Sequence, residues 1–445
     1  VKVLYWDEAS KVVDTFPTSR PSKALRAQVY ERDPFIYIFT SGTTGLPKAS
    51  KISHTRFYLG GLPISTFCYM KPGKRMYTCL PLYHSAAGML GVGGILRSGA
   101  TMVVRKKFSV RAFSSDIVKY KCTSVQYIGE LCRYLVNAPP NAEDANVRIT
   151  YAIGNGMRPD IWDKFQKRYN VKRVIEFYAA TEGNANLFNS TGKQGPLGFI
   201  PIFIANMVYP LKILRVSEED KSQPYRDPKT GLCVVAESNE VGLIVNVVNN
   251  KIVQSRFDGY SDAAASNKKL LTDVLKKGDC YFNSGDLLYR CPEGFYYWSD
   301  RVGDTFRWKG ENVATTEVAE AVGAVPGFND VTVYGVSVPD CDGKVGMAAV
   351  VLKDGVTAES IDWAAFHREC SANLPVYARP AFIRVTPTMQ MTSTFKHQKN
   401  DLSKEGYDLQ LIKDGPVFFY NTKDGKVVPL TQAIVNDINS GKIKL

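Results

Sequence analysis

The chain has 445 residues, more than one compact hydrophobic core organises, so at least two domains are expected. Hydrophobic residues make up 44% and charged residues 22%, which is the balance of an ordinary globular protein. Lys and Arg outnumber Asp and Glu by 56 to 43, and the net charge of +13 favours an anionic partner such as an acidic membrane face or a phosphate-rich ligand. No stretch combines basic residues with stacking aromatics as nucleic-acid modules do, so we expect no nucleic-acid partner.

The cysteines argue against a zinc site or a disulfide framework, and the apolar windows argue against a transmembrane helix. The nine cysteines are scattered and form no CxxC pair, and Cys122 and Cys132, ten positions apart, have no His or second Cys nearby to complete a zinc site. We therefore expect reduced thiols in a cytosol-facing protein. The longest apolar windows are Ala86–Leu96 and Gly198–Leu214. The first is too short for a spanning helix and prolines interrupt the second, so no transmembrane helix is expected in this chain.

Taken in chain order, apolar and β-branched runs predict a series of strands: Phe35–Phe39, Met76–Leu80, Thr101–Val104, Ser124–Ile128 and Val241–Val248. Helical periods lie between several of them. One period joins Val110, Phe113, Ile117 and Tyr120, and another opens at Pro159. Strands that alternate with helices indicate an α/β architecture with largely parallel sheets.

Two later regions depart from this pattern. The polar segment Ser217–Thr230 is typical of a surface loop. From Val331 onward a smaller pattern predicts a compact C-terminal α+β domain, with elements at Val331–Val338, Met347–Leu352, Ser360–Ala372 and Phe382–Thr386.

The strongest local feature is a loop from Thr40 to Lys48 that directly follows the first predicted strand. It contains the glycines Gly42 and Gly45 and the hydroxyl residues Thr40, Ser41, Thr43 and Thr44. Such a loop presents backbone N–H groups and hydroxyls to a polyphosphate, and Lys48 adds a compact positive charge. The spacing is G-x-x-G-x-x-K and Ala49 follows the Lys, so this is not a Walker A loop.

The segment from Tyr37 to Lys48 resembles the phosphate loop of the adenylate-forming superfamily, which includes acyl-CoA synthetases, luciferases and peptide-synthetase adenylation domains. Four other segments are similar to the fatty acid transport protein/very-long-chain acyl-CoA synthetase family: residues 127–135, 154–162, 177–184 and 303–313. The resemblance covers the chain from about Asp33 to its end. It implies a large N-terminal AMP-binding domain at residues 1–302, with parallel-rich sheets, and a small mobile C-terminal α+β domain at residues 303–445.

Members of that family carry a membrane segment and roughly two hundred residues, a domain's worth of chain, before this loop. Only about forty residues precede it here. We therefore expect this chain to be a fragment, an alternative product or a truncated gene model, with an incomplete N-terminal domain. Membrane contact is expected through the preceding region, on the cytosolic face of the endoplasmic reticulum, a peroxisome or the plasma membrane. A homodimer is left open.

The resemblance assigns the nucleotide contacts residue by residue. Tyr178 would stack on adenine, opposite a wall formed by Asn155 and Gly156. Taken without that context, an aromatic residue at position 178 is more typical of a core. Thr181 would contact the α-phosphate, and Glu182 would hold Mg²⁺, which favours carboxylate and phosphate oxygens.

The remaining nucleotide and gate residues follow in the same way. Asp286 would accept the two ribose hydroxyls, and Arg301 would also reach the ribose. His84 matches the gate beside the reacting carboxylate, and Gly303 and Asp304 match the hinge between the two domains.

The adenylation lysine maps to Lys396, and the loop Gly310–Val313 resembles the lining of the CoA thiol tunnel. The resemblance thus implies a ligase that uses ATP, CoA and Mg²⁺ to convert long or very long fatty acids first to acyl-adenylates and then to acyl-CoA, coupled to fatty acid uptake. Two alternatives stay open: a ligase for bile acids or other bulky carboxylates, and a fatty acid transporter with little or no catalysis.

Overall fold

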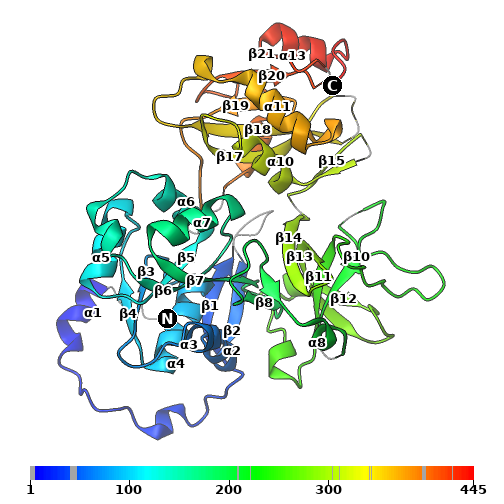
Figure 1. Cartoon of the computed structure of the whole chain (residues 1–445). Coiled ribbons are helices and arrows are strands. Elements are labelled where there is room, and N and C mark those ends of the chain that lie inside the picture. Colours follow the sequence, from blue (N-terminus) through cyan, green and yellow to red (C-terminus); the bar gives the residue numbers. More distant parts are fainter. Residues whose placement is uncertain are drawn as a thin grey trace.

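The structure, a computed structural model, arranges the chain as three units (Figure 1). The first unit holds the elements α1 to β8, the second unit holds β9 to β14, and the C-terminal unit, drawn above the other two, holds β15 to α13. The structure describes residues 6–40, 48–207, 210–220, 222–302, 304–309, 311–339, 341, 343–392, 397–422 and 424–445.

The first unit is built on a six-stranded sheet in the order β4-β3-β5-β6-β7-β8. The strands from β4 to β7 run parallel, and β8 is antiparallel. The strands are β3 (Arg75–Thr78), β4 (Thr101–Val104), β5 (Ser124–Ile128), β6 (Ile149–Asn155), β7 (Val171–Ala179) and β8 (Asn186–Asn189); the helices between them are α5 (Val110–Lys119), α6 (Gly129–Asn137), η3 (Ala142–Asn146) and α7 (Pro159–Arg168). The predicted α/β alternation is confirmed here, because parallel neighbours need crossover connections and helices supply them.

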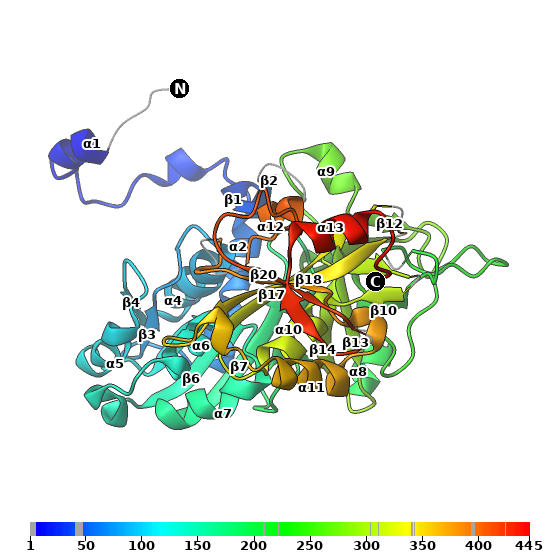
Figure 2. The same ribbon diagram turned by 90° about the horizontal axis from the view of Figure 1, so that it is seen from above.

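A β-hairpin and a group of short helices precede and flank that sheet. Strand β1 (Pro34–Thr40) pairs antiparallel with β2 (Lys48–Ser53), and residues 41–47 between them lie outside the described residues. The short helices are α1 (Trp6–Val13), η1 (Lys23–Arg26), α2 (His54–Gly60), α3 (Leu62–Phe67), η2 (Ala86–Val92) and α4 (Gly93–Ser98). Helices α2 to α4 pack tightly, since a Cβ at Gly61 would lie 2.3 Å from the carbonyl carbon of Gly93. Figure 2 shows α1 extending away from the sheets.

The second unit contains a sheet in the order β10-β11-β13-β14-β9, with β12 beside β13. All of its pairs are antiparallel, so the prediction of largely parallel sheets was wrong for this unit. Its elements are β9 (Gly198–Phe199), α8 (Ile202–Met207), β10 (Leu211–Arg215), β11 (Gly242–Val247), η4 (Val253–Ser255), α9 (Ala263–Asn267), β12 (Leu270–Thr272), β13 (Cys280–Arg290) and β14 (Phe295–Arg301). Tight turns and loops join its neighbouring strands, and these connections suit antiparallel pairing. The described part of the predicted loop Ser217–Thr230 contains no helix or strand.

The C-terminal unit confirms the predicted α+β pattern. Its sheet has the order β17-β18-β19-β20-β21, in which only the pair β18–β19 is parallel, and β15 and β16 form a separate hairpin. Its elements are β15 (Phe306–Trp308), β16 (Glu311–Val313), α10 (Thr315–Gly323), β17 (Phe328–Ser337), β18 (Lys344–Leu352), η5 (Ala358–Ser360), α11 (Trp363–Asn373), η6 (Val376–Ala378), β19 (Phe382–Val385), α12 (Asn400–Glu405), β20 (Val417–Tyr420), β21 (Val427–Pro429) and α13 (Gln432–Asn439). One hydrophobic core spans Phe306 to Ile438. The domain boundary after residue 302 stays a prediction.

The main core of the first unit lies between its sheet and the helices α5, α6 and α7. Trp162 and Phe165 on α7 are fully buried against β6 and β7. All nine cysteines are free thiols, and seven of them are buried. Within the described ranges, no helix is both long enough and apolar enough to cross a bilayer.

Phe165 offers a direct test of this core. We expect Phe165→Ala to lower the free energy of unfolding by about 3–5 kcal/mol, because it leaves a cavity under the sheet. Phe203→Ala is the matched control, since Phe203 is 67% exposed on α8. Urea denaturation of both variants measures the difference, and equal effects would contradict the placement of Phe165.

Candidate active site

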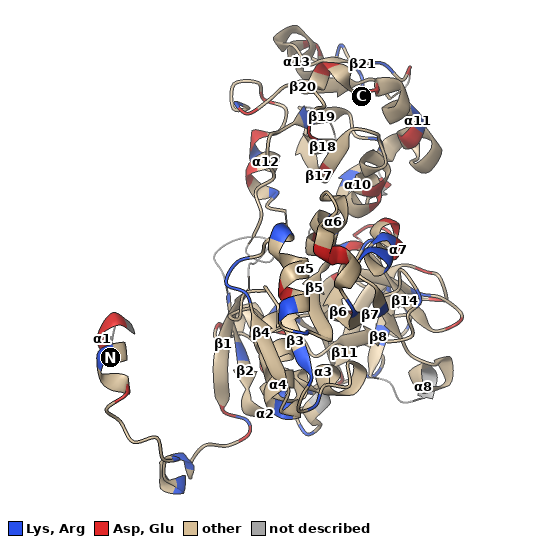
Figure 3. Cartoon of the chain, turned by 60° about the vertical axis from the view of Figure 1, so that its left-hand side comes forward, with Lys and Arg blue, Asp and Glu red and all other residues tan. Residues whose placement is uncertain are grey.

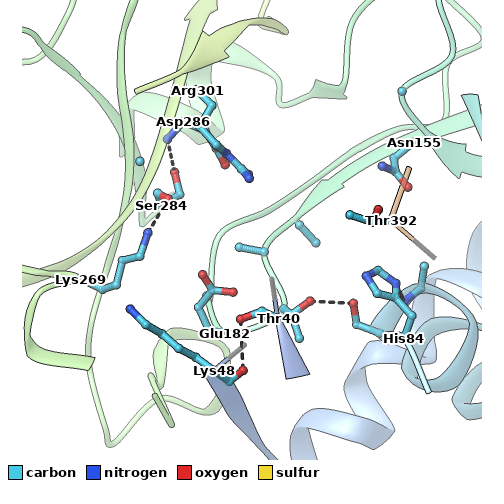
Figure 4. A pocket seen from close by; sticks show the side chains of 18 of the residues that line it. Thr40, Lys48, His84, Asn155, Glu182, Lys269, Ser284, Asp286, Arg301 and Thr392 are labelled. Carbon is cyan, nitrogen blue, oxygen red and sulfur yellow. Dashed lines mark hydrogen bonds and ion pairs between the residues drawn. The ribbon is translucent and has the colours of Figure 1, made fainter. Parts of the chain in front are cut away.

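A cleft of about 2240 Å³ lies at the junction of the three units. In the first unit it is lined by residues that follow β3, β5, β6 and β7, which is the carboxyl edge of the parallel strands and the usual ligand position in such sheets. Ten of the site residues predicted from the sequence line it: Thr40, Lys48, His84, Asn155, Gly156, Thr181, Glu182, Asp286, Arg301 and Asp304. Figure 4 shows most of them around one space.

Seven other predicted residues lie outside the described part of the chain: Ser41, Gly42, Thr43, Thr44, Gly45, Gly303 and Lys396. Their roles therefore stay predictions. Thr40 and Lys48, at the two ends of the predicted phosphate loop, are joined by a 3.3 Å hydrogen bond from the Thr40 hydroxyl to the Lys48 carbonyl oxygen.

Arg56 on α2, which the sequence did not single out, fixes the turn that carries Glu182. Its Nη1 donates to the carbonyl oxygen of Glu182 at 3.0 Å. Its Nη2 donates to the carbonyl oxygens of Ala180, Thr181 and Gly183, the bond to Thr181 being 2.7 Å long. Burial lowers the pKa of the Arg56 guanidinium, opposed by the nearby Asp258 and Glu182 carboxylates. The Arg56 guanidinium thus donates hydrogen bonds to four consecutive carbonyl oxygens just after β7.

Tyr260, a second residue that the sequence did not reveal, contacts both Glu182 and Lys48. The Tyr260 hydroxyl donates to Oε1 of Glu182 at 2.8 Å, and Nζ of Lys48 lies 5.7 Å from the centre of the Tyr260 ring. Burial and the adjacent Glu182 carboxylate raise the pKa of Tyr260, so its hydroxyl stays protonated and donates. The other carboxylate oxygen of Glu182, Oε2, takes no part in the bond to Tyr260.

Beside Glu182, the hydroxyl of Thr181 lies 2.8 Å from that of Ser85. The backbone N–H of Ala86 donates to Nδ1 of His84 at 3.3 Å, and His84 lines the cleft at the start of η2. The turn after β3 and the turn after β7 therefore meet at the predicted α-phosphate and carboxylate positions.

Asp286 is buried and its carboxylate is held on both sides. Oδ1 accepts from Nε of Arg301 at 2.7 Å, and Oδ2 accepts from the Tyr178 hydroxyl at 2.6 Å. The Tyr178 ring packs in the core near Trp298, is only 7% exposed and does not line the cleft. Phe177 lines the cleft, while alternation along β7 turns Tyr178 toward the second unit. The adenine stacking predicted for Tyr178 stays a prediction.

A third unexpected residue, Lys269, adds a cation between Asp286 and Glu182. Its Nζ donates to the carbonyl oxygen of Ser284 at 2.9 Å, and the side chain points into the cleft (Figure 4). Burial lowers the pKa of Lys269, while the Glu182 and Asp286 carboxylates raise it. The cations of Lys48, Lys269 and Arg301 give this part of the cleft the charge that a polyphosphate requires.

The Asn155–Gly156 wall rests on the buried carboxyl of Glu176, which the sequence also did not reveal. It accepts from the backbone N–H groups of Gly156 and Met157 at 2.9 and 3.0 Å and from the Tyr127 hydroxyl at 2.5 Å. Gly156 has a φ of 78°, a left-handed conformation that glycine adopts without strain. Burial raises the pKa of Glu176 to about 8, against the lowering effect of these three hydrogen bonds.

Residues on the two sides of the predicted hinge are hydrogen-bonded to each other. The buried carboxylate of Asp300 accepts from the backbone N–H of Thr315 at 2.8 Å, at the first turn of α10, where Ala314 supplies no side-chain cap. Nζ of Lys399 donates to the Thr315 hydroxyl at 3.0 Å. Asp304 lines the cleft. Its hinge role stays a prediction.

The described residues contain no group of three or more His, Cys, Asp or Glu side chains arranged to hold a metal ion. Glu182 nevertheless fits the role predicted for it. Its carboxylate is held by Tyr260 and opens into the cleft, and one protein carboxylate together with substrate phosphates is how Mg²⁺ is usually bound.

Comparison with known proteins defines the class. The family model described as AMP-binding enzyme matches residues 2–211, and the one described as AMP-binding enzyme C-terminal domain matches residues 317–396. ATP-bound MatB from Rhodopseudomonas palustris has a TM-score of 0.68 at 22% identity, over 85% of this chain and 69% of that one. The O-succinylbenzoate coenzyme A synthetase of Bacillus subtilis with AMP has a TM-score of 0.64 at 21% identity, over 87% and 71%. The fold is that of the adenylate-forming enzymes.

Sequence relatives narrow the class to one family. Long-chain fatty acid transport protein 1 of Homo sapiens is 42% identical over 440 residues, 99% of this chain and 66% of that protein. Long-chain fatty acid transport protein 2 of Rattus norvegicus is 42% identical over 424 residues, 95% of this chain and 67% of that protein. The chain belongs to the long-chain fatty acid transport protein family of AMP-binding enzymes, and it spans about two thirds of the length of these relatives.

Glu176 makes the free energy of unfolding depend on pH. Its carboxyl keeps a proton to about pH 8 in the folded chain but loses it near 4.5 when unfolded, so the folded state binds the extra proton between these values. The free energy of unfolding therefore falls as the pH rises through this window, by about 1.4 kcal/mol per pH unit. Glu176→Gln is neutral throughout. We expect the wild-type-minus-variant difference, measured by denaturant titration, to decline from pH 5 to 8, and a constant difference would contradict this placement.

Proposed function

We propose that the protein is an ATP-dependent acyl-CoA ligase for long or very long fatty acids, which forms an acyl-adenylate and then an acyl-CoA, coupled to fatty acid uptake. One observation carries the proposal. Lys48, Glu182 and the Asp286–Arg301 pair come from three distant parts of the sequence and line a single cleft, in the family and fold just described.

The roles of the nucleotide-binding residues follow from their positions. Asp286, aligned by Arg301 and Tyr178, is proposed to accept the ribose hydroxyls with its remaining lone pairs. Asn155 and Gly156, supported by Glu176, form one wall for the adenine. The part we propose for Tyr178 is therefore to position Asp286.

The proposed first step takes place between Thr181, Glu182 and the predicted phosphate loop. A fatty-acid carboxylate oxygen attacks the α-phosphorus of ATP, forming the acyl-phosphate bond as the bond to pyrophosphate breaks. When bound, Mg²⁺ offsets the charge of the phosphates, and Glu182 would hold it. Lys48, Lys269 and Lys396 are proposed to stabilise the negative charge that builds up on the phosphates and the leaving group.

In the proposed second step, the CoA thiolate attacks the acyl carbon and AMP leaves. The C-terminal unit is proposed to rotate about Gly303 and Asp304 between the two steps, so that Lys396 leaves the site and the loop Gly310–Val313 enters it. Such motions of lids and domains are common in enzymes whose chemistry proceeds in stages.

The acid is proposed to be a fatty acid because the cleft is apolar beyond His84. The side chains on this wall come from α2, α3, η2 and β8: Leu59, Leu62, Pro63, Met89, Leu90 and Phe188. An acyl chain buries well against such a wall, at about 0.8 kcal/mol per methylene. A bile acid or another bulky carboxylate remains the alternative acid within the same chemistry.

Cell location and assembly belong to the proposal as well. We propose association with the cytosolic face of a membrane of the endoplasmic reticulum, a peroxisome or the plasma membrane, because the relatives are named as fatty acid transport proteins. A homodimer is one candidate assembly. A transporter with little or no catalysis is the second candidate function, and those names favour it, but transport alone requires no polyphosphate-binding cations.

The experiment that decides between these functions is an assay of CoA-dependent AMP release by the purified protein, with MgATP and saturated acids of increasing length. We expect release that depends on both the acid and CoA and is fastest with long acids. A cholic acid arm tests the bulky-acid alternative. No AMP release with any acid, despite binding of the acids, would favour transport without catalysis.

Glu182→Gln removes the charge that would hold Mg²⁺ and keeps the shape and an oxygen for the Tyr260 bond. We expect the rate of acid-dependent ATP–pyrophosphate exchange to fall by about 10²–10³ with the melting temperature unchanged, because one preorganised charge is lost. Glu218→Gln, on an exposed loop, is the matched control. Normal exchange by the Glu182 variant would refute the proposed role.

Lys396→Ala should separate the two half-reactions. Formation of the acyl-adenylate from acid and ATP should fall by about 10²–10³, the typical effect of losing one preorganised donor. Conversion of supplied acyl-adenylate and CoA to thioester should hardly change, because the rotated unit carries Lys396 away. Lys413→Ala, exposed in the same unit, is the control. Equal losses in both half-reactions would make Lys396 a structural residue, and no loss would place the catalytic lysine elsewhere, with Lys399 the nearest candidate in the cleft.

A further inference from the structure

Arg133 on α6 is a buried cation that connects the first unit to the C-terminal unit. Only 4% of the residue is exposed. Its Nη2 lies 2.5 Å from Oε1 of Glu130 on the same helix and 3.5 Å from Oδ2 of Asp330 on β17. Its Nη1 donates to the carbonyl oxygen and, at 3.4 Å, to the side-chain oxygen of Asn329. One guanidinium is thus shared between the two units.

The contact continues to the segment that carries the predicted adenylation lysine. Oδ2 of Asp330 also lies 3.0 Å from Nε2 of His397, the residue that directly follows Lys396 in the sequence. The hydroxyl of Tyr134, next to Arg133 on α6, donates to the sulfur of Met391 at 3.5 Å. Met391 and His397 face each other as an isolated antiparallel bridge. Of two adjacent residues of α6, Tyr134 therefore contacts Met391 directly and Arg133 is linked to His397 through Asp330.

Helix α6 is also part of the cleft. It begins directly after β5, and Glu130 in its first turn lines the cleft together with His397. A Cβ at Gly129 would lie 1.7 Å from the Gly156 carbonyl oxygen, so the helix starts in contact with the proposed adenine wall. Figure 3 shows α6 at the top of the first unit, next to β17 and α10, with charged residues at this junction.

We propose that Arg133 and Tyr134 form a docking site for the C-terminal unit, through Asn329, Asp330 and Met391, and that this contact selects the domain pose in which the acyl-adenylate is made. Arg133 is a positioning residue, which acts through Asp330 and His397 and not by touching the substrates. The inference rests on the proposed function, since Lys396 serves adenylation there. It adds the contact that decides how often the C-terminal unit takes the adenylating pose.

The charged groups of this contact allow it to form and break reversibly. A buried ion pair gains little net free energy, because the cost of removing both charges from water nearly offsets their attraction. When the C-terminal unit moves away, Arg133 stays paired with Glu130 and becomes hydrated again. Opening therefore leaves no buried charge without a partner. Replacing Arg133 alone would leave the Asp330 carboxylate facing Glu130 without this cation in the closed pose, so the closed pose would lose stability.

The test compares Arg133→Met and the conservative Arg133→Lys with the wild type in the intact protein. We expect Arg133→Met to slow acid-dependent ATP–pyrophosphate exchange about tenfold through kcat, with little change in KM for ATP, as for a moderate coupling energy. Thioester formation from supplied acyl-adenylate and CoA should stay near the wild-type rate. Arg133→Lys should restore part of the exchange rate, because it keeps the cation without the planar fork.

Hydrogen–deuterium exchange gives a readout that needs no ligase activity. In Arg133→Met we expect faster amide exchange in peptides that cover residues 326–332 and 388–399, and no change in β6 or β13. Arg168→Met is the matched control, since Arg168 pairs with Asp144 at 2.8 Å within the first unit. That control should leave these peptides and the ratio of the two half-reactions unchanged.

The outcomes separate this inference from the proposed function. If wild type forms no acyl-adenylate, the proposed function fails, while the exchange pattern of Arg133→Met still supports or refutes the dock. Equal loss of both half-reactions, or unchanged exchange in both peptides, would overturn the inference. If Arg133→Met does not fold, Asp330→Asn weakens the same pair from the other side and must show the same selective loss.

Discussion

The cleft depends on the hydrogen bonds of a single guanidinium, that of the half-buried Arg56. A guanidinium carries several N–H groups in a fixed geometry, and here they donate to the carbonyl oxygens just after β7. These bonds fix the turn that carries Glu182 against α2, which directly follows the hairpin β1–β2. The hairpin is in turn bridged to the second unit, through the pair Ser50–Tyr260 and through a bond from Ser53 to Asp258 at 3.0 Å. One constraint therefore sets the relative positions of three sequence regions.

The other charges of the site are arranged on the same principle, with each buried group held by neighbouring polar residues. Asp286 is fixed by Tyr178 and Arg301, while Glu176 fixes the wall at Gly156. Such support keeps charges and dipoles oriented before a substrate arrives, so little reorganisation remains during the reaction. The contact between α6 and the C-terminal unit differs, because it joins parts that are proposed to separate.

The sequence predicted local elements and motifs well, and three-dimensional partnerships poorly. Runs such as Thr101–Val104 and Ser124–Ile128 were predicted with the same bounds as β4 and β5, because apolar periodicity is local information. The residues of the phosphate-loop and ribose motifs were likewise visible. Arg56, Tyr260, Lys269 and Glu176 were not, because each acquires its role from partners 15 to 127 positions away. The contact of Lys269 with Ser284, 15 positions on, lies across a turn that no pattern marked. The antiparallel second sheet was missed because an apolar run does not show the direction of its partner.

We propose that this cleft makes and holds an acyl-adenylate. The most direct measurement is a single-turnover reaction of the enzyme in excess over a long fatty acid, with MgATP and without CoA, stopped in acid and analysed by mass spectrometry. We expect one acyl-AMP per active site, formed together with pyrophosphate and discharged to acyl-CoA when CoA is added. Release of ADP, or formation of acyl-CoA with no acyl-AMP at any time, would contradict it.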